Sequence, residues 1–185
     1  MVIASHVIFC AYGFWLPNDP RGSWSDVVAA WELLRFGRAT TTDTRRSVAG
    51  AQHDIQQRRL AKRALKYPHV SFTGTQALTI SRGFAKAITE SDYRVHACAI
   101  LPEHVHMVIA RHADRTVERI VGHLKGRATQ ALVDADWPKG RPVWAERCWK
   151  VFLDDDRDVH RAIDYVNQNP IKERKPPQTW SFIHR

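Results

Sequence analysis

Residues Tyr93–Ala110 read YRVHACAILPEHVHMVIA, and this stretch decides the fold. It holds two apolar runs, at residues 93–101 and 105–110, joined by a short segment that contains Pro102 and Glu103. Two strand-forming runs with so short a connection predict a tight antiparallel hairpin. We therefore expect these residues to form neighbouring strands of one sheet.

The flanking sequence alternates between strand and helix patterns. One further strand is predicted before the hairpin, at residues 2–12, and another after it, within residues 143–153. This order indicates an α+β fold in which helices cover a small antiparallel sheet. Helices are expected at residues 26–36, 51–66, 75–90, 114–133 and 154–169.

Two residues are expected to mark the ends of helices that follow the hairpin. Asp114 can cap the helix that starts there. Pro170 is expected to end the last helix, because proline restricts the residue before it and cannot continue the hydrogen-bond ladder. Beyond it, Trp180 and Phe182 in a basic tail can dock back onto the domain.

The chain of 185 residues suits a single domain, residues 1–185, with a basic helical insertion at about residues 20–70. Its formal net charge is +9, and residues 35–66 alone hold nine Lys or Arg against two Asp. Such a one-signed surface predicts a polyanionic partner, usually nucleic acid. A solvated helix face without a partner is the alternative. The cations assigned there to DNA phosphates are Arg58, Arg59, Lys62 and Arg63.

Cysteine usage and hydropathy argue against several classes of protein. Cys10, Cys98 and Cys148 are far apart in apolar surroundings, so three buried free thiols in a reducing cytoplasm are expected. The N-terminus lacks the basic and then apolar pattern of a signal peptide. No stretch approaches the ~20 apolar residues that a membrane-spanning helix needs. No membrane partner is therefore expected.

Two histidines in the second strand of the hairpin are candidate metal ligands. His104 and His106 are two residues apart, and side chains alternate along a strand, so both imidazoles are expected on one face. Val105, Met107 and Ile109 would then point into the core. Two imidazoles so placed can share a divalent metal ion. A pair of partly exposed strand histidines without a metal is the alternative.

The last predicted helix carries Tyr165 and Asn169, which are four residues apart and so share a face. Both flank the buried stripe of that helix and could reach the rim of the sheet. The amide oxygen of Asn169 is a candidate third metal ligand. A phenol becomes an effective nucleophile when a base or cation assists it, and a metal ion offsets the charge that builds on a phosphodiester under attack. An amphipathic tyrosine at the helix edge is the alternative.

At these residues the sequence resembles a known family. Leu101-Pro102-Glu103-His104-Val105-His106-Met107 resembles the HUH motif of single-tyrosine transposases. Asp164-Tyr165-Val166-Asn167-Gln168-Asn169-Pro170-Ile171-Lys172 resembles their catalytic helix. Within this family, the sequence is most similar to the REP-associated tyrosine transposase branch, which is related to insertion-sequence transposases.

The resemblance implies a ferredoxin-like antiparallel sheet with the histidine pair on a central strand. It implies Mg²⁺ or Mn²⁺ held by His104 and His106, with Asn169 at the position of a third polar ligand. It also implies that Tyr165 cuts single-stranded DNA beside a hairpin, leaving a 5′-phosphotyrosine and a free 3′-hydroxyl. After the catalytic helix, Glu173-Arg174-Lys175 stands where the family often has small residues and Gly.

The expected partner is therefore single-stranded or hairpin DNA, bound by a monomer. Arg119, Lys125 and Arg127 are expected to contact phosphates beside the site, and Trp15 or Trp24 could stack on a base. Two other functions stay open. A catalytically silent module that binds DNA hairpins predicts binding without a covalent adduct. A metal-dependent hydrolase that uses water predicts cleavage that survives loss of the phenol.

Overall fold

The computed structural model describes residues 1–14, 16, 31–37, 52 and 54–184. In this part of the chain, four strands form a sheet in the order β2-β3-β1-β4, with all neighbours antiparallel. Together with the helices that cover it, this sheet confirms the expected α+β fold class. The elements are β1 (Ala4–Ala11), the 3₁₀ helix η1 (Trp31–Phe36), α1 (Ile55–Arg63), α2 (Gly74–Ser91), β2 (Val95–Ile100), β3 (His104–Ala110), α3 (Val117–Asp134), β4 (Trp144–Leu153) and α4 (Asp156–Lys172).

Strand pairing decides which side chains share a face of the sheet. Ile8 of β1 lies opposite His106 of β3, and His6 lies opposite Val108. Directly opposed residues of antiparallel strands project from the same face, and so do alternate residues along one strand. His6, His104 and His106 therefore project from one face of the sheet.

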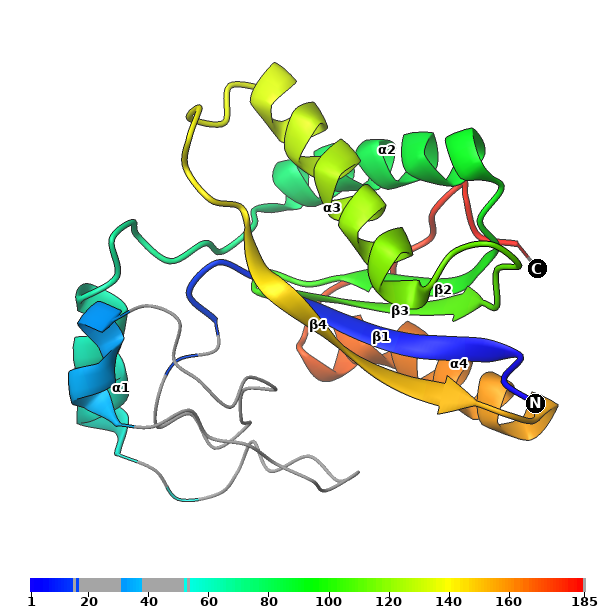
Figure 1. Cartoon of the computed structure of the whole chain (residues 1–185), viewed down its shortest axis with the longest axis horizontal. Helices are drawn as coiled ribbons and strands as arrows, with labels where there is room; N and C mark the ends of the chain where they lie inside the picture. The colour runs from blue at the N-terminus through cyan, green and yellow to red at the C-terminus, as the bar shows by residue number, and fades with distance from the viewer. Residues whose placement is uncertain (15, 17–30, 38–51, 53, 185) are drawn as a thin grey trace.

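Helices cover both faces of the sheet (Figure 1). α2 and α3 pack on the face opposite the histidines, where Phe9, Phe84, Met107 and Leu124 are buried in the main core. Removing these large apolar side chains from water is the main stabilising contribution of that layer. α4 covers the histidine face over a smaller core, and short side chains there let it pack closely on β2 and β3. That core includes Ala97, Ala99, Val108, Ala162 and Val166.

The start of α3 differs from the prediction. Thr116 caps it, because its hydroxyl accepts the Arg119 N–H three residues on. Asp114 lies in the preceding loop, where its own N–H donates to His112 Nδ1 at 3.1 Å. The expected capping role of Asp114 is therefore wrong, although the helix itself is present.

The last helix also extends beyond its predicted end. The prediction that Pro170 ends it is wrong, since α4 continues through Pro170 to Lys172. Proline removes one N–H donor, but the hydrogen bonds of the following turn still form here. The Glu173 N–H donates to the Asn169 carbonyl at 3.2 Å, and the Lys175 N–H donates to the Pro170 carbonyl at 2.8 Å. Asn169 therefore stays in the helix, in register with the turn before it.

The C-terminal tail covers the outer edge of β2. Gln178 accepts the Ile100 N–H and donates to the Ile100 carbonyl, both at 2.8 Å, much as a neighbouring strand would. The Trp180 indole N–H donates to the Cys98 carbonyl, and Phe182 is buried in the main core. The tail thus docks as expected, and it protects an edge that could otherwise pair with another chain.

The described part of the insertion after β1 contains two helical segments, η1 and α1. α1 is shorter than the helix predicted at residues 51–66. η1 is the final part of the helix predicted at residues 26–36, of which residues 26–30 lie outside the described part of the chain. η1 and α1 pack around a small core of their own, made of Leu16, Leu33 and Ala61.

The predicted burial of the three cysteines is confirmed at Cys10 and Cys98 and is wrong at Cys148. Cys10 and Cys98 are buried, Cys148 is half-buried, and all three are free thiols. Burial raises the pKa of the Cys98 thiol, which disfavours the reactive thiolate. Among the described helices, none is both long and apolar enough to cross a membrane.

Candidate active site

His104 and His106 lie on β3 and project from the same face of the sheet, as predicted. Their ring centroids are 4.9 Å apart. His106 is buried, whereas His104 is half-buried at the start of the strand, with the Phe14 ring centroid 5.3 Å from its own. Two imidazoles at this separation can share one divalent ion.

α4 brings Tyr165 to the histidine pair. The ring centroids of Tyr165 and His106 are 5.6 Å apart, with the ring planes at 69°. Tyr165 is 43% exposed, so its phenol contacts solvent as well as the buried imidazole. Lys172 lies near the end of the same helix, and its ammonium is 4.8 Å from the Tyr165 ring centroid. One copy of the chain therefore brings together a histidine pair, a tyrosine and a cation.

Asn169 is buried one turn after Tyr165 on α4. Its assignment as a metal ligand stays a prediction. Within the described residues, no three His, Cys, Asp or Glu side chains are arranged to hold a metal ion. An ion at His104 and His106 would need further ligands such as an amide, a phosphate or water, which Mg²⁺ and Mn²⁺ accept. Two imidazoles and a buried amide fit that requirement.

A third imidazole adjoins this pair, and the sequence did not indicate it. His6 of β1 is buried, and its Nε2 lies 3.1 Å from Nδ1 of His106. Its ring stacks on His106 with centroids 5.3 Å apart and meets Tyr165 edge-on at 5.7 Å. The only sequence signal for it is a histidine within an apolar strand. Pairing it with His106 requires the register of β1 against β3, which the sequence does not provide.

Burial controls the charge of the two inner imidazoles. It lowers the pKa of His6 to about 4. It also lowers the pKa of His106 well below the usual range, and the neighbouring His104 and His6 add to that effect. Both rings are therefore neutral near pH 7, and a neutral imidazole keeps the lone pair that a metal ligand needs.

His104 has a carboxylate neighbour as well. Glu173 Oε1 lies 3.8 Å from His104 Nε2. Glu173 is the C-cap residue of α4, at the point where the sequence departs from the pattern of the similar transposases. The departure therefore adds a negative charge beside the histidine pair.

A family model described as "Transposase IS200 like" matches residues 63–168, which is more than half of the chain. The chain belongs to the IS200-like transposase family. The matched segment runs from the end of α1 into α4 and includes both histidines of β3 and Tyr165.

This member of the IS200-like transposase family is similar to two REP-associated proteins. One, from Haemophilus influenzae, is named a REP-associated tyrosine transposase and is 30% identical over 86 residues, which are 41% of this chain and 48% of that protein. The chain thus spans about half the length of that relative. The other is a REP-associated tyrosine transposase solved bound to a REP hairpin, with 14% identity and a TM-score of 0.52 over 92% of this chain and 68% of that one. This likeness supports the same fold.

The basic helix α1 borders the His104 end of the sheet. Lys62 donates to Glu103, the residue before His104, at 3.1 Å. The contact fixes one cation of the predicted DNA-binding set beside the candidate active site. The other three, Arg58, Arg59 and Arg63, are partly or fully exposed on the same helix.

The basic residues of α3 lie on the other side of the sheet, because α3 and α4 cover opposite faces (Figure 1). The expectation that they flank the site is therefore wrong. Arg119 is exposed, and Arg127 donates to Glu90 of α2 at 2.7 Å.

Lys125 is buried and turned inward, which removes it from the surface expected to bind phosphates. Its ammonium donates to the carbonyls of Ala145, Glu146 and Arg147 at 2.7, 3.2 and 3.1 Å.

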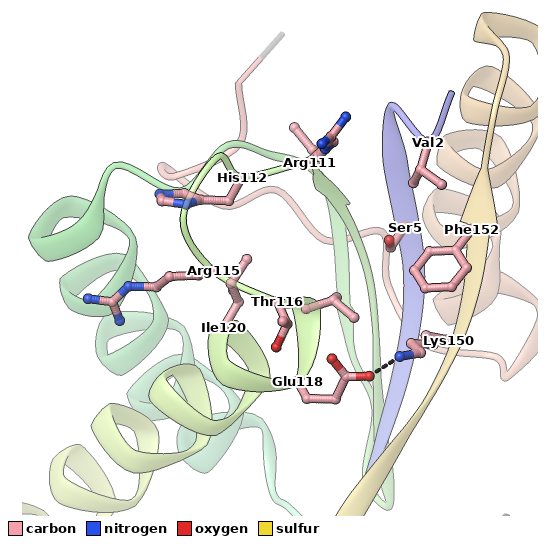
Figure 2. Close-up of a pocket in the computed structure, with 12 residues that line it drawn as sticks. Val2, Ser5, Arg111, His112, Arg115, Thr116, Glu118, Ile120, Lys150 and Phe152 are labelled. Carbon is pink, nitrogen blue, oxygen red and sulfur yellow. Dashed lines mark hydrogen bonds and ion pairs between the residues drawn. The ribbon is translucent and has the colours of Figure 1, made fainter.

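A cavity of about 290 Å³ lies near the start of α3 (Figure 2). Phe152, Arg115 and the ion pair of Lys150 with Glu118 line it. These side chains lie on the α3 side of the sheet, so the cavity is separate from the histidine pair. Trp15 and Trp24, the candidate base-stacking residues, lie outside the described part of the chain.

Proposed function

We propose that this transposase cuts and rejoins single-stranded DNA beside a hairpin, with Tyr165 as the nucleophile and Mg²⁺ or Mn²⁺ held by His104 and His106. The observation that carries the proposal is the contact between Tyr165 of α4 and His106 of β3, with centroids 5.6 Å apart. A half-exposed phenol beside buried neutral imidazoles is an arrangement suited to attack on a bound phosphodiester.

In the proposed reaction, the Tyr165 phenol loses its proton and its oxygen attacks a DNA phosphorus. The bond between that phosphorus and the 3′ oxygen breaks, and the 3′ oxygen takes up a proton. The products are a 5′-phosphotyrosine and a free 3′-hydroxyl. Because the phosphotyrosine conserves the energy of the broken bond, a DNA hydroxyl can later attack it and rejoin a strand without ATP.

Each side chain of the site has a distinct proposed task. His104 and His106 hold the ion, which, when bound, offsets negative charge on the phosphate. Asn169 supplies an amide oxygen as a third ligand. The Lys172 ammonium, 4.8 Å from the Tyr165 ring centroid, attracts the scissile phosphate to the phenol.

The proposed substrate follows from charge and from the relatives. The chain has a net charge of +9, and α1 presents its cations beside His104. A relative solved with a REP hairpin supports a hairpin as the recognised element. Because Tyr165 and the histidines belong to one copy of the chain, a monomer is the proposed active unit.

Two alternatives predict different outcomes. A catalytically silent hairpin-binding module would bind DNA without a covalent adduct. A hydrolase that activates water would cut DNA whether or not the phenol is present. The contacts of Tyr165 with two imidazoles and a lysine favour a reacting tyrosine over both.

The decisive experiment incubates a labelled DNA hairpin with flanking single strands, with Mg²⁺ or Mn²⁺, and separates covalent adducts on a denaturing gel. Wild type should form an adduct, and Tyr165→Phe should not, while DNA affinity changes little. Tyr67→Phe is the matched control, because the described ring contacts of Tyr67 are with Tyr12 and Lys66 and not with the histidine pair, so it should keep full adduct formation. Cleavage by Tyr165→Phe at the wild-type rate would favour the hydrolase.

A further inference from the structure

His6 and His106 form a buried imidazole pair across two strands. His6 Nε2 lies 3.1 Å from His106 Nδ1, which is hydrogen-bond distance. The two rings stack, with centroids 5.3 Å apart and planes at 22°. His6 is 8% exposed and His106 is 4% exposed, so water does not compete freely for this contact.

We infer that His6 is a positioning residue that holds His106 in the tautomer with its proton on Nδ1. That tautomer leaves Nε2 of His106 unprotonated and available as a metal ligand atom. The inference rests on the proposed metal-binding function of His106. It adds a residue of β1 to a site otherwise built from β3 and α4.

The proton count of the pair allows two arrangements, and only one of them leaves Nε2 of His106 available to bind a metal ion. A neutral imidazole carries one proton, so a hydrogen bond between Nε2 of His6 and Nδ1 of His106 needs one nitrogen to donate and the other to accept. If His106 donates, its Nε2 keeps a lone pair. If His6 donates, the proton of His106 sits on Nε2 and blocks that atom as a ligand.

The surroundings of His6 restrict its movement. The Trp149 ring of β4 meets it edge-on at 5.7 Å, and the Tyr165 ring of α4 does so at the same distance. β1 is an inner strand, hydrogen-bonded to both β3 and β4. A ring that contacts two further aromatic rings and lies on an inner strand can fix the orientation of its partner, as outer hydrogen-bond partners of metal-binding histidines commonly do.

Two substitutions of His6 separate hydrogen bonding from packing. His6→Phe keeps a planar ring of similar size between Trp149 and Tyr165 but removes the bonding nitrogen. His6→Gln places an amide near the position of Nε2, so it can accept the proton of His106 again. His160→Phe is the matched control, because His160 is exposed on α4 and bonds only locally to the Asp156 carbonyl among the contacts described.

The first measurement is made without metal, by ¹⁵N NMR of the histidine side chains. In wild type we expect the His106 proton on Nδ1. In His6→Phe we expect a shift of the His106 ring signals toward a mixture of tautomers, and in His6→Gln a return toward wild type. A wild-type His106 proton on Nε2 would overturn the inference, and this outcome needs no variant to fold.

The second measurement is Mn²⁺ affinity, followed by the loss of the free-ion signal in electron paramagnetic resonance. We expect His6→Phe to weaken Mn²⁺ binding by about 10- to 100-fold, with His6→Gln and His160→Phe close to wild type. Equal affinities in wild type and a folded His6→Phe would overturn the positioning role. Absence of Mn²⁺ binding in wild type would instead contradict the proposed metal function, while the NMR result would still decide the tautomer.

Discussion

Tyr165 on α4 and His106 on β3 lie in ring contact, with centroids 5.6 Å apart, although 58 residues separate them in the chain. Their meeting depends on how closely α4 packs on the sheet. Ala97 and Ala99 of β2 face Ala162 of α4 in the core beneath that helix. Small side chains at this interface shorten the distance between helix and sheet, so the phenol can reach the imidazole.

Asn169 is the proposed third ligand of the metal ion. We expect Asn169→Ala to lower the rate of adduct formation at least tenfold, because an oxygen donor is lost, while DNA affinity stays near wild type. Asn169→Asp should retain much of the activity, since a carboxylate oxygen can replace the amide oxygen toward Mg²⁺. Adduct assays at several Mn²⁺ concentrations check this. Full activity of a folded Asn169→Ala would exclude the residue as a ligand.

The two basic surfaces should contribute unequally to DNA binding. Reversing the charges of α1 should weaken binding at low salt by tenfold or more and flatten the salt dependence of the affinity. The changes are Arg58→Glu, Arg59→Glu, Lys62→Glu and Arg63→Glu together.

The matched control for α1 lies on the far side of the sheet. Arg119→Glu with Arg127→Glu should have a smaller effect on affinity per charge changed, because α3 is separated from the histidine pair by the sheet. Fluorescence anisotropy over a range of salt concentrations measures the DNA affinity of the α1 variant and of the α3 variant. A larger loss from the α3 pair would mean that DNA approaches the other face.

Lys125 should act on stability and not on DNA binding. Its buried ammonium serves three carbonyls of β4. Lys125→Met keeps much of the side-chain volume but leaves those carbonyls without this donor, so we expect a loss of about 1–3 kcal/mol in the free energy of unfolding. Arg127→Met, on a more exposed position of the same helix, should cost less. Urea denaturation provides the comparison, and an unchanged midpoint for Lys125→Met would contradict the structural role.

Gly83 should be intolerant of a side chain, because α2 and α3 touch there. A Cβ on Gly83 would lie 2.5 Å from the Ala128 Cα. Gly83→Ala should therefore destabilise the protein by about 1–3 kcal/mol despite the better helix propensity of alanine. At Gly122 of α3 a Cβ would meet nothing within 4 Å, so Gly122→Ala should stabilise by up to about 1 kcal/mol. Thermal unfolding should show a lower melting temperature than wild type for Gly83→Ala and a higher one for Gly122→Ala.

Local patterns predicted the elements and the shared face of the two strand histidines well. The hairpin, the amphipathic helices and the alternation on β3 are short-range features, and apolar periodicity reveals them directly. The family motif added Tyr165, which spacing alone could not have linked to a strand more than fifty residues away.

Two of the remaining features depend on contacts distant in sequence. His6 joins His106 only through the register of β1 on β3. Lys125 looked like a surface cation, but the path of β4 beneath α3 turns it inward. Pro170 looked like a helix end, yet hydrogen bonds of the next turn continue α4 past it. For His6 and Lys125, contacts distant in sequence decide the position of the side chain, whereas at Pro170 local hydrogen bonds outweigh the usual preference of proline.

The most direct test of the central claim is to map the covalent adduct by mass spectrometry. Trypsin cuts after Arg161 and Lys172, so Tyr165 falls in the peptide from Ala162 to Lys172. After reaction with hairpin DNA and Mn²⁺, followed by nuclease and trypsin digestion, we predict a 5′-phosphonucleotide on Tyr165 in that peptide. An adduct on another residue, or efficient cleavage with this peptide unmodified throughout the reaction, would contradict the account.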